Sequence, residues 1–216
     1  MRALSESSSS SWYRETWRSA VTAIVVVLAG SLLIGGSTSF AQQYLPSWLN
    51  SLSNSAGGWT MFSFLLVWLS RARPLLGLVL GVVSFESLNE GYGIVSGWRG
   101  FDYGAPFSTS WALVGLAAGP LLGIAASLTR YGRPLWRMLG VTPLAAVLLA
   151  EGVWALTHIS DTTSPVYWTL EVVLSAIFVG AALLQKRPWP REAALVITVW
   201  LVGAASFWAL IVVLFA

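Results

Sequence analysis

The sequence predicts an all-α fold, a polytopic transmembrane helix bundle of about seven spans, and three observations support this prediction. Hydrophobic residues make up 56% of the chain and charged residues only 10%, whereas roughly one quarter of the residues in a soluble domain are charged. The chain contains seven apolar runs separated by short polar gaps. Basic residues fall in alternate gaps, which is typical of a membrane protein with a defined inside and outside.

The basic residues also predict the orientation, because Lys and Arg in short loops stay on the cytoplasmic side of a membrane. Of the twelve basic residues, only Arg99 breaks the alternation. We therefore expect a multi-pass protein of the plasma (inner) membrane with its N-terminus inside and its C-terminus outside. The basic residues that follow the alternation are Arg2, Arg14, Arg18, Arg71, Arg73, Arg130, Arg133, Arg137, Lys186, Arg187 and Arg191.

The chain begins with a polar cytoplasmic tail, residues 1–18, and continues as one transmembrane helical domain, residues 19–216. The first span, 20–40, is long enough to cross a hydrocarbon core of ~30 Å at the helical rise. Its end also resembles a signal-peptidase site, but the run is long for a signal and further spans follow, so we favour an uncleaved span.

The second apolar run, 58–70, is shorter than the ~17 residues usually needed to cross a membrane. The two arginines that follow it, Arg71 and Arg73, fit an inside loop only if this run crosses. Without it the bundle has six spans. The remaining predicted spans are 75–92, 109–129, 138–157, 166–184 and 193–215.

Glycines at four-residue spacing occur in the third and fourth predicted spans. Such spacing builds a flat helix face on which another backbone can approach closely. These faces usually serve packing inside a bundle, although a face left on the outside would bind a partner membrane protein or a second copy of the chain. The glycines are Gly77 and Gly81 in one span and Gly115, Gly119 and Gly123 in the other.

Composition excludes several classes of site. The chain has no cysteine and one histidine, so it cannot form disulfides, thiolate zinc sites or multi-histidine metal sites. Its only lysine lies in a loop, outside any phosphate-binding motif. The pI of 9.6 reflects basic loops next to the lipid headgroups, the main expected partner, rather than a nucleic-acid surface. We expect no cofactor, no metal and no nucleic-acid partner.

Three glutamates lie inside predicted spans: Glu86, Glu151 and Glu171. An ionisable group at the centre of a span costs about 2.5 to 3.5 kcal/mol, so each needs a reason. Counted from the inside loops, all three lie at mid-membrane or in the outer half. They suggest a site for a small cationic or polyhydroxylated molecule. Alternatively, each is protonated or hydrogen-bonded to a neighbouring helix and serves only to hold the bundle together.

Helical spacing extends this candidate ligand site. Glu86 and Glu90 are four residues apart on one helix face, and Glu151, Trp154 and His158 share a face of another helix. These faces could converge on one outward-opening cavity, in which Trp154 supplies an aromatic wall for a cation.

Two outer loops would cover such a cavity. Residues 42–55 have an apolar face at helical spacing and an opposite face rich in Ser and Asn, including Asn54, which predicts an amphipathic segment on the outer leaflet. Residues 91–104 mix glycines and aromatics with Arg99 and Asp102, which we expect to form an exposed ion pair. This second loop is either a solvated turn or a glycine-hinged lid whose arginine faces the glutamates.

Five short motifs carry a family resemblance: Gln43-Tyr44-Leu45-Pro46, the run 51–59 (SLSNSAGGW), Arg99-Gly100, the run 118–123 (AGPLLG) and Ala150-Glu151-Gly152. Over roughly residues 28–155 the chain resembles a family of bacterial multi-pass membrane proteins known only as a domain of unknown function. The resemblance implies a membrane protein and no particular activity. At fold level the chain is also similar to the substrate-capture subunits of energy-coupling-factor vitamin transporters, but those have six spans and both ends inside.

The sequence therefore supports three hypotheses. The first is a protein that binds or transports a small molecule, with cations among the candidate ligands, through an outward-facing site. The second is a non-catalytic accessory or assembly protein that binds a partner through its glycine faces. The third is an intramembrane enzyme, which would require two of Ser37, Ser39, His158 and the glutamates to meet within hydrogen-bond distance.

Overall fold

The computed structural model describes residues 15–104 and 107–215. It is 83% helical, and the described ranges contain no strand, so the predicted all-α fold is confirmed. In chain order the elements are α1 (Trp17–Tyr44), the 3-10 helix η1 (Asn50–Asn54), α2 (Ala56–Ser70), α3 (Pro74–Trp98), α4 (Ser110–Tyr131), α5 (Pro134–Leu139), α6 (Thr142–His158), α7 (Pro165–Lys186) and α8 (Pro190–Phe215). The first fourteen residues of the predicted polar tail lie outside the described residues.

Each of the seven predicted apolar runs folds as helix, with α5 and α6 sharing one run. Five helical segments have the length and hydropathy to cross a membrane: Trp17–Tyr44, Trp111–Tyr131, Pro134–His158, Pro165–Gln185 and Pro190–Val213. The apolar helix α2 has 15 residues and is about 22 Å long, shorter than the hydrocarbon core. Large apolar side chains cover the outside, as at Leu33 and Val213, which are 72% and 79% exposed. Such a surface is compatible with an integral membrane protein, whose exterior contacts lipid.

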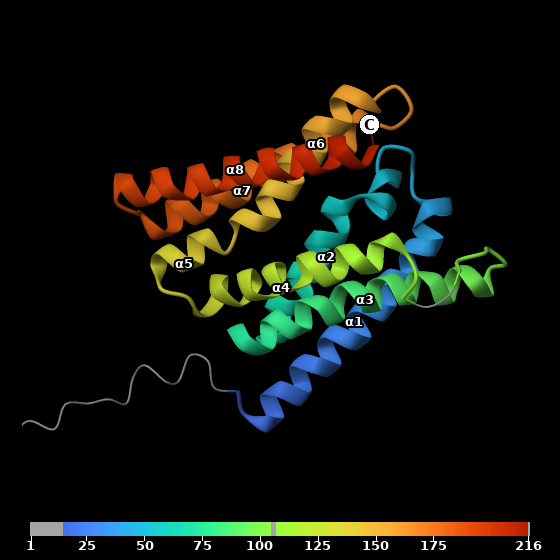
Figure 1. Ribbon diagram of the computed structural model, residues 1–216, viewed down its shortest axis with the longest axis horizontal. Helices are drawn as coiled ribbons and strands as arrows, with labels where there is room; N and C mark the ends of the chain where they lie inside the picture. The colour runs from blue at the N-terminus through green and yellow to red at the C-terminus, as the bar shows by residue number, and fades with distance from the viewer. Residues whose placement is uncertain (1–14, 105–106, 216) are drawn as a thin grey trace, which may run out of the picture.

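The helices form two layers with α2 between them (Figure 1). In one layer α3 packs against both α1 and α4, and in the other α6 packs against both α7 and α8. The short helix α2 contacts α1, α3 and α4 on one side and α6 on the other. Most of the side chains of α2 are buried, so this helix is the main link between the layers.

Glycine contacts hold α3 and α4 together. A Cβ added to Gly81 would lie 2.8 Å from the carbonyl carbon of Gly119, and one added to Gly123 would lie 2.8 Å from that of Gly77. The prediction of close helix contact is thus confirmed. Because these glycines face one another inside the protein, they leave no free face with which to bind a partner helix.

Helix α3 is longer than the predicted span 75–92 and continues to Trp98. The sequence suggested a loop here because glycine usually interrupts helices. In the structure Gly91 lies against the backbone of Leu32 in α1, and Gly93 lies against the ring of Tyr103. The glycines therefore mark close packing rather than a loop, and a hinge at these positions is not what the structure shows.

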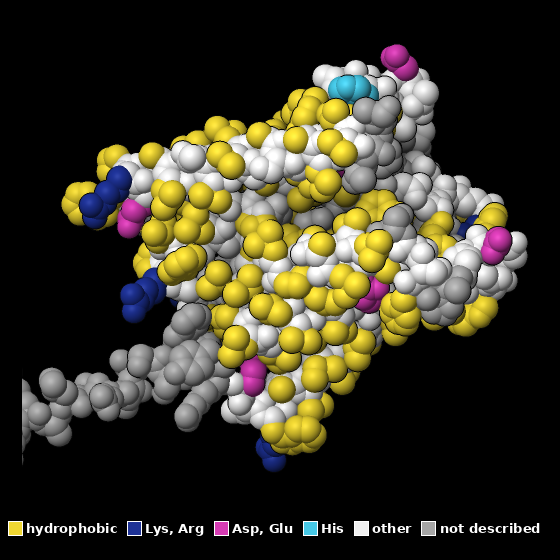
Figure 2. Space-filling view, in the orientation of Figure 1, with side chains coloured by type: hydrophobic (Ala, Val, Ile, Leu, Met, Phe, Trp, Pro, Cys, Tyr) yellow, Lys and Arg dark blue, Asp and Glu magenta, His cyan; other side chains and the backbone are white. Residues whose placement is uncertain are grey.

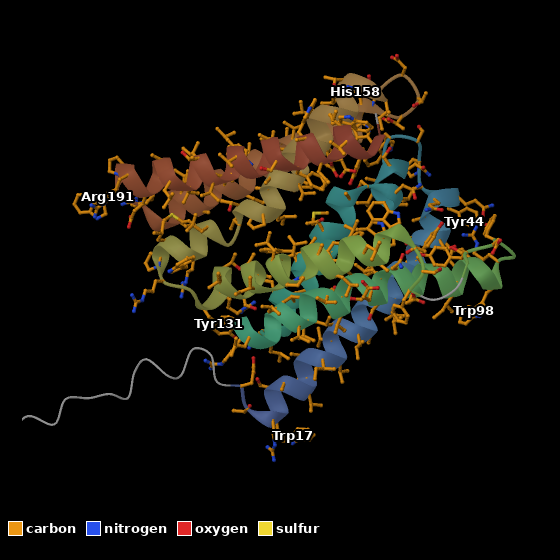
Figure 3. All side chains as sticks on the ribbon, viewed as in Figure 1. Trp17, Tyr44, Trp98, Tyr131, His158 and Arg191 are labelled. Carbon is orange, nitrogen blue, oxygen red and sulfur yellow. The ribbon has the colours of Figure 1, made fainter. Side chains whose placement is uncertain are left out.

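The two ends of the molecule differ in charge. Trp17, Tyr131 and Arg191 lie at one end, and Tyr44, Trp98 and His158 at the other (Figure 3). Lys and Arg side chains gather at the first end, while hydrophobic side chains cover the length between the ends (Figure 2). We call the first the arginine-rich end. Arg18 and Arg130 adjoin Trp17 and Tyr131 in the sequence, and Arg71 and Arg73 contact Tyr131. Arg133 and Arg137 follow Tyr131 in the chain, with Arg137 bonded to Gly132, and Arg187 precedes Arg191 in the same loop.

Candidate functional site

Helix α2 begins inside the protein: Ser55, Gly57 and Gly58 are buried and Ala56 is half-buried. Ser55 is the N-cap, and its hydroxyl oxygen accepts a hydrogen bond of 2.9 Å from the N–H of Gly58. An isolated helix leaves its first four N–H groups without partners. Ser55 satisfies one of them, and others need an acceptor from elsewhere in the fold.

That acceptor is Glu151 of α6. Its Oε1 accepts a hydrogen bond of 2.8 Å from the N–H of Ala56, and its Oε2 accepts one from the N–H of Gly57. A carboxylate is well suited to this place because the N-terminus of a helix carries a partial positive charge. The contact also joins α2 to the layer of α6, α7 and α8, although α2 and α6 are far apart in the sequence.

Glu171 of α7 lies beside this cap and is only 2% exposed. Its Oε1 accepts a hydrogen bond of 2.7 Å from the hydroxyl of Tyr167. The Tyr167 oxygen lies 2.5 Å from the Oγ of Ser55; since the only tyrosine proton goes to Glu171, Ser55 is the donor. The bonds form a chain from Ser55 through Tyr167 to Glu171. The other carboxyl oxygen, Oε2, is buried with no hydrogen-bond partner in the described part of the chain.

Gly57 brings the two carboxyl groups close together. Its N–H binds Glu151, and the carboxyl group of Glu171 occupies the space that a Cβ at this position would fill. The two glutamates interact electrostatically. We call Ser55, Gly57, Glu151, Tyr167 and Glu171 the carboxyl junction.

The chemistry of the carboxyl junction follows from its charge. Two ionised carboxylates so close together in a buried site are unfavourable unless positive charge compensates them. The end of α2 compensates Glu151. Glu171 has only the neutral hydroxyl groups of Tyr167 and Ser55 beside it, and no cation contacts it among the described residues. The junction can therefore take up one further positive charge, either a proton or a small cation.

Replacing Tyr167 with Phe should lower the free energy of unfolding by about 1–3 kcal/mol, because Ser55 and Glu171 would each lose a buried partner. Denaturant titration of the purified protein measures this change. Tyr44→Phe is the matched control, since Tyr44 is 71% exposed. An equal effect of both substitutions would contradict the hydrogen-bond chain.

Glu86 and Glu90 lie in a second group, between α3, α4 and the connecting loop. Both carboxyl oxygens of Glu86 are buried without a hydrogen-bond partner in residues 15–104 and 107–215, and a Cβ at Gly115 of α4 would lie 2.6 Å from one of them. Glu90 accepts a hydrogen bond of 2.9 Å from the N–H of Phe107. This group shares no hydrogen bond with the carboxyl junction, so the predicted glutamates form two groups rather than one.

The loop after α3 is fixed to α3 by Asn89. The Nδ2 of Asn89 donates to Thr109 over 2.9 Å, and its Oδ1 accepts from the hydroxyl of Tyr103. Burial raises the pKa of Tyr103 above its ordinary value, which keeps this hydroxyl protonated as a donor. The ring of Tyr92 lies 5.2 Å from that of Tyr103. The loop is thus packed onto the helix end.

Arg99 does not form the expected ion pair with Asp102. Its guanidinium donates to the backbone oxygen and the Oγ of Ser39 and to Gln43 at the end of α1, while Asp102 accepts from the N–H of Gly104 over 3.3 Å. The physical reason is that the C-terminal part of α1, where Ser39 and Gln43 lie, carries partial negative charge and attracts the guanidinium. Arg99 therefore ties α3 to α1 and does not face the glutamates as part of a lid.

The other predicted site residues lie near the same end. Trp154 stacks on His158 at 5.2 Å between ring centroids and packs against the cluster that contains Tyr167. Asn54 accepts a hydrogen bond of 2.5 Å from Gln42 and so holds η1 against α1. Residues 42–55, predicted as one amphipathic segment, instead comprise the last turn of α1, a bend and η1.

The serines and the histidine of the enzyme hypothesis do not meet. Ser37 donates to the carbonyl of Leu33, and Ser39 bonds with Ser96 and Arg99. His158 bonds with Thr157 and with the backbone of its own helix. Among the residues that the structure describes, no group of three His, Cys, Asp or Glu side chains could hold a metal ion.

Sequence reasoning missed three members of the carboxyl junction: Ser55, Gly57 and Tyr167. Two signals were available. Ser55 precedes Ala-Gly-Gly and an apolar run, which is the pattern of an N-cap. Tyr167 lies four residues before Glu171, the spacing at which helical side chains meet. Neither signal shows that the start of α2 lies next to Tyr167 and Glu171.

Comparisons with known proteins identify a family for the chain but no activity. No curated protein matches the chain, and no solved structure matches it, so the fold-level similarity to vitamin-transporter subunits stays a prediction. The model of one family matches residues 14–215, and that family is described as a family of unknown function (DUF6518). This match covers nearly the whole chain, and the protein therefore belongs to the DUF6518 family of unknown function.

Proposed function

We propose that this protein is a seven-span, non-catalytic membrane protein that binds a small organic cation at Glu151 and Glu171 and moves it across the membrane in exchange for a proton. In this proposal the arginine-rich end is cytoplasmic, the C-terminus is outside, and the membrane is the plasma membrane. The carboxyl junction then lies toward the outside, because Ser55 comes directly after η1, near the end opposite the arginine-rich end.

One observation carries the proposal: Glu171 is buried beside Glu151 and has a carboxyl oxygen with no partner in the described chain. Intramembrane acidic residues of this kind are costly and commonly mark ion pathways or proton relays. A proton and an ammonium group compete for the same oxygen, since either one supplies the positive charge that the junction lacks. This competition is the simplest basis for exchange.

The architecture supports the same proposal. The junction lies where the start of α2, between the two layers, meets α6 and α7. Transporters often place a short or interrupted helix, with its exposed backbone ends, at the interface of two moving units. Helix α2 is short, central and capped by a side chain from the other layer, so breaking the Glu151 contact would free the layers to move.

A second function, an accessory protein that binds a membrane-protein partner, is favoured by a different observation. Both oxygens of Glu151 are bonded within the chain, as expected of a purely structural link. Under this second proposal Glu171 is permanently protonated, and the partner is bound through the exposed apolar surface rather than through the glycines. The two proposals differ in whether the junction responds to pH and to cations.

The substitution Glu171→Gln distinguishes the exchange proposal from the accessory-protein proposal. The amide keeps the shape of the protonated carboxyl group but cannot gain or lose a proton. We expect the wild type to be stabilised against heat by small organic amines at alkaline pH, and less so at acidic pH where protons compete. Glu171→Gln should fold normally and lose this response. Asp161→Asn, which removes an exposed acidic group, is the control and should keep it.

The measurement is the midpoint of thermal unfolding in detergent, recorded with a panel of primary to quaternary amines at several pH values. The exchange proposal is rejected, and the accessory-protein proposal is favoured, if the unfolding midpoint of Glu171→Gln responds to every amine and to pH in the same way as that of the wild type.

A further inference from the structure

A cavity of ≈ 370 Å³ lies between the layers, away from the carboxyl junction. Its walls come from the second half of α2 and from α4, α5, α6 and α7, and they include Phe64, Leu65, Trp68, Arg137, Phe178 and Gln185. The volume is within the range of ~300–1,000 Å³ found for small-molecule sites. Most of the lining is apolar, and it contains no Asp or Glu.

Two arginines lie at the edge of this cavity. Arg137 lines it and donates from Nε to the carbonyl of Gly132 over 2.7 Å, a bond that leaves its two terminal nitrogens for another acceptor. Arg130 places its guanidinium 4.2 Å from the ring centre of Trp68, which also lines the cavity. The Nε of Arg130 is buried and has no acceptor in the described ranges.

Part of the cavity border is open to the surroundings of the protein. Leu65 is 42% exposed and Trp68 is 36% exposed. Both arginines belong to the arginine-rich end, where Tyr131 also lies (Figure 3). In the sequence Trp136 is next to Arg137, and Trp189 is two residues before Arg191. Tryptophan, tyrosine and arginine are the residues that gather at the level of lipid headgroups. An apolar cavity with cations at this level has the chemistry of a lipid: a hydrocarbon chain inside and a negative group at the border.

We infer that this cavity is a binding site for an anionic glycerophospholipid of the leaflet next to the arginine-rich end. One acyl chain lies in the cavity against Phe64 and Phe178, and the phosphate accepts hydrogen bonds from Arg130 and Arg137. Guanidinium groups bind phosphate oxygens with strong, charge-assisted hydrogen bonds. The two uncompensated arginines favour a headgroup with net negative charge over a zwitterionic one. This inference does not depend on the function proposed for the carboxyl junction.

The test is native mass spectrometry of the delipidated, detergent-purified protein, titrated separately with phosphatidylglycerol and phosphatidylcholine. We expect phosphatidylglycerol to bind more tightly, and each of Arg130→Gln and Arg137→Gln to weaken it roughly fivefold. Arg133→Gln is the matched control, since Arg133 is exposed at the same end, whereas Arg137 lines the cavity and Arg130 stacks on Trp68, which lines it. It should change the affinity less than twofold.

A second variant tests the acyl chain separately. Ala181 lines the cavity, so Ala181→Phe should fill it and weaken phosphatidylglycerol while both arginines remain. Each variant is first checked by its thermal unfolding midpoint, so that loss of fold is not mistaken for loss of binding. Three results would overturn the inference: equal binding of the two lipids, an equal effect of Arg133→Gln, or displacement of the lipid by inorganic phosphate together with no effect of Ala181→Phe.

Discussion

Replacing Glu151 with Ala is expected to lower the free energy of unfolding by about 2–6 kcal/mol, one of the largest effects of any single substitution in this chain. The N–H groups of Ala56 and Gly57 would lose their acceptor. A buried donor left without a partner costs about 1–3 kcal/mol, and two are lost together. The end of the α2 dipole would also lose its compensating charge.

Two further variants identify the cause of this loss. Glu151→Gln removes the charge and replaces one of the two acceptor oxygens with an NH2 group, so only one of the two N–H groups keeps its acceptor. Its loss of stability should therefore be smaller than that of Glu151→Ala. Asp161→Ala removes an exposed acidic side chain from the loop before α7 and should change stability by less than about 0.5 kcal/mol. Titration with a denaturing detergent measures all three. A loss at Glu151 no larger than at Asp161 would show that the α2 cap is not stabilising.

Gly81→Val is expected to separate α3 from α4 and to prevent normal accumulation of the folded protein. The nearest atoms to a Cβ at Gly81 belong to the backbone of Gly119 and Gly123, which cannot move aside as a flexible side chain can. Overpacking in a well-packed core typically costs about 1–3 kcal/mol. Because the valine would collide with the backbone of α4, the loss of stability should exceed that range.

Gly180→Ala is the control for this prediction. No atom lies within 4 Å of a Cβ at Gly180 in α7, so alanine should be tolerated there and should gain up to about 1 kcal/mol from its higher helix propensity. Expression level and unfolding midpoint of the two variants give the comparison. Equal behaviour of Gly81→Val and Gly180→Ala would contradict the close contact between α3 and α4.

Much of the fold was predictable because its determinants are local. Each apolar run became a helix, and the run of 58–70 became α2 with only two added residues. The glycines at positions 77, 81, 119 and 123 met as their spacing predicted. The length of α3 was not predictable in this way, because Gly91 and Gly93 have the same local pattern whether they form a loop or pack against α1 and Tyr103.

The candidate site was predictable only in part. Glu151 and Glu171 stood out because a carboxyl group in a span is costly. The partner of Glu151, the first turn of α2, lies about a hundred residues away in the sequence, and no local pattern pairs the two. Arg99 shows the same limit: its charge pointed to Asp102 nearby, but its guanidinium contacts Ser39 and Gln43 of α1, which no local pattern indicates. A small polar residue such as Ser55 does not carry the energetic cost of a carboxyl group in a span, so it gives no comparable signal.

The central claim is that Glu171 exchanges a proton for a cation, and the most direct measurement is the charge displaced by a pH jump across proteoliposomes adsorbed on a solid-supported membrane. We predict a transient current on an alkaline jump in the wild type and in Asp161→Asn, reduced when a binding amine is present. Glu171→Gln should give no such current. A current of equal size in Glu171→Gln would contradict the account, because the released proton would then come from another group.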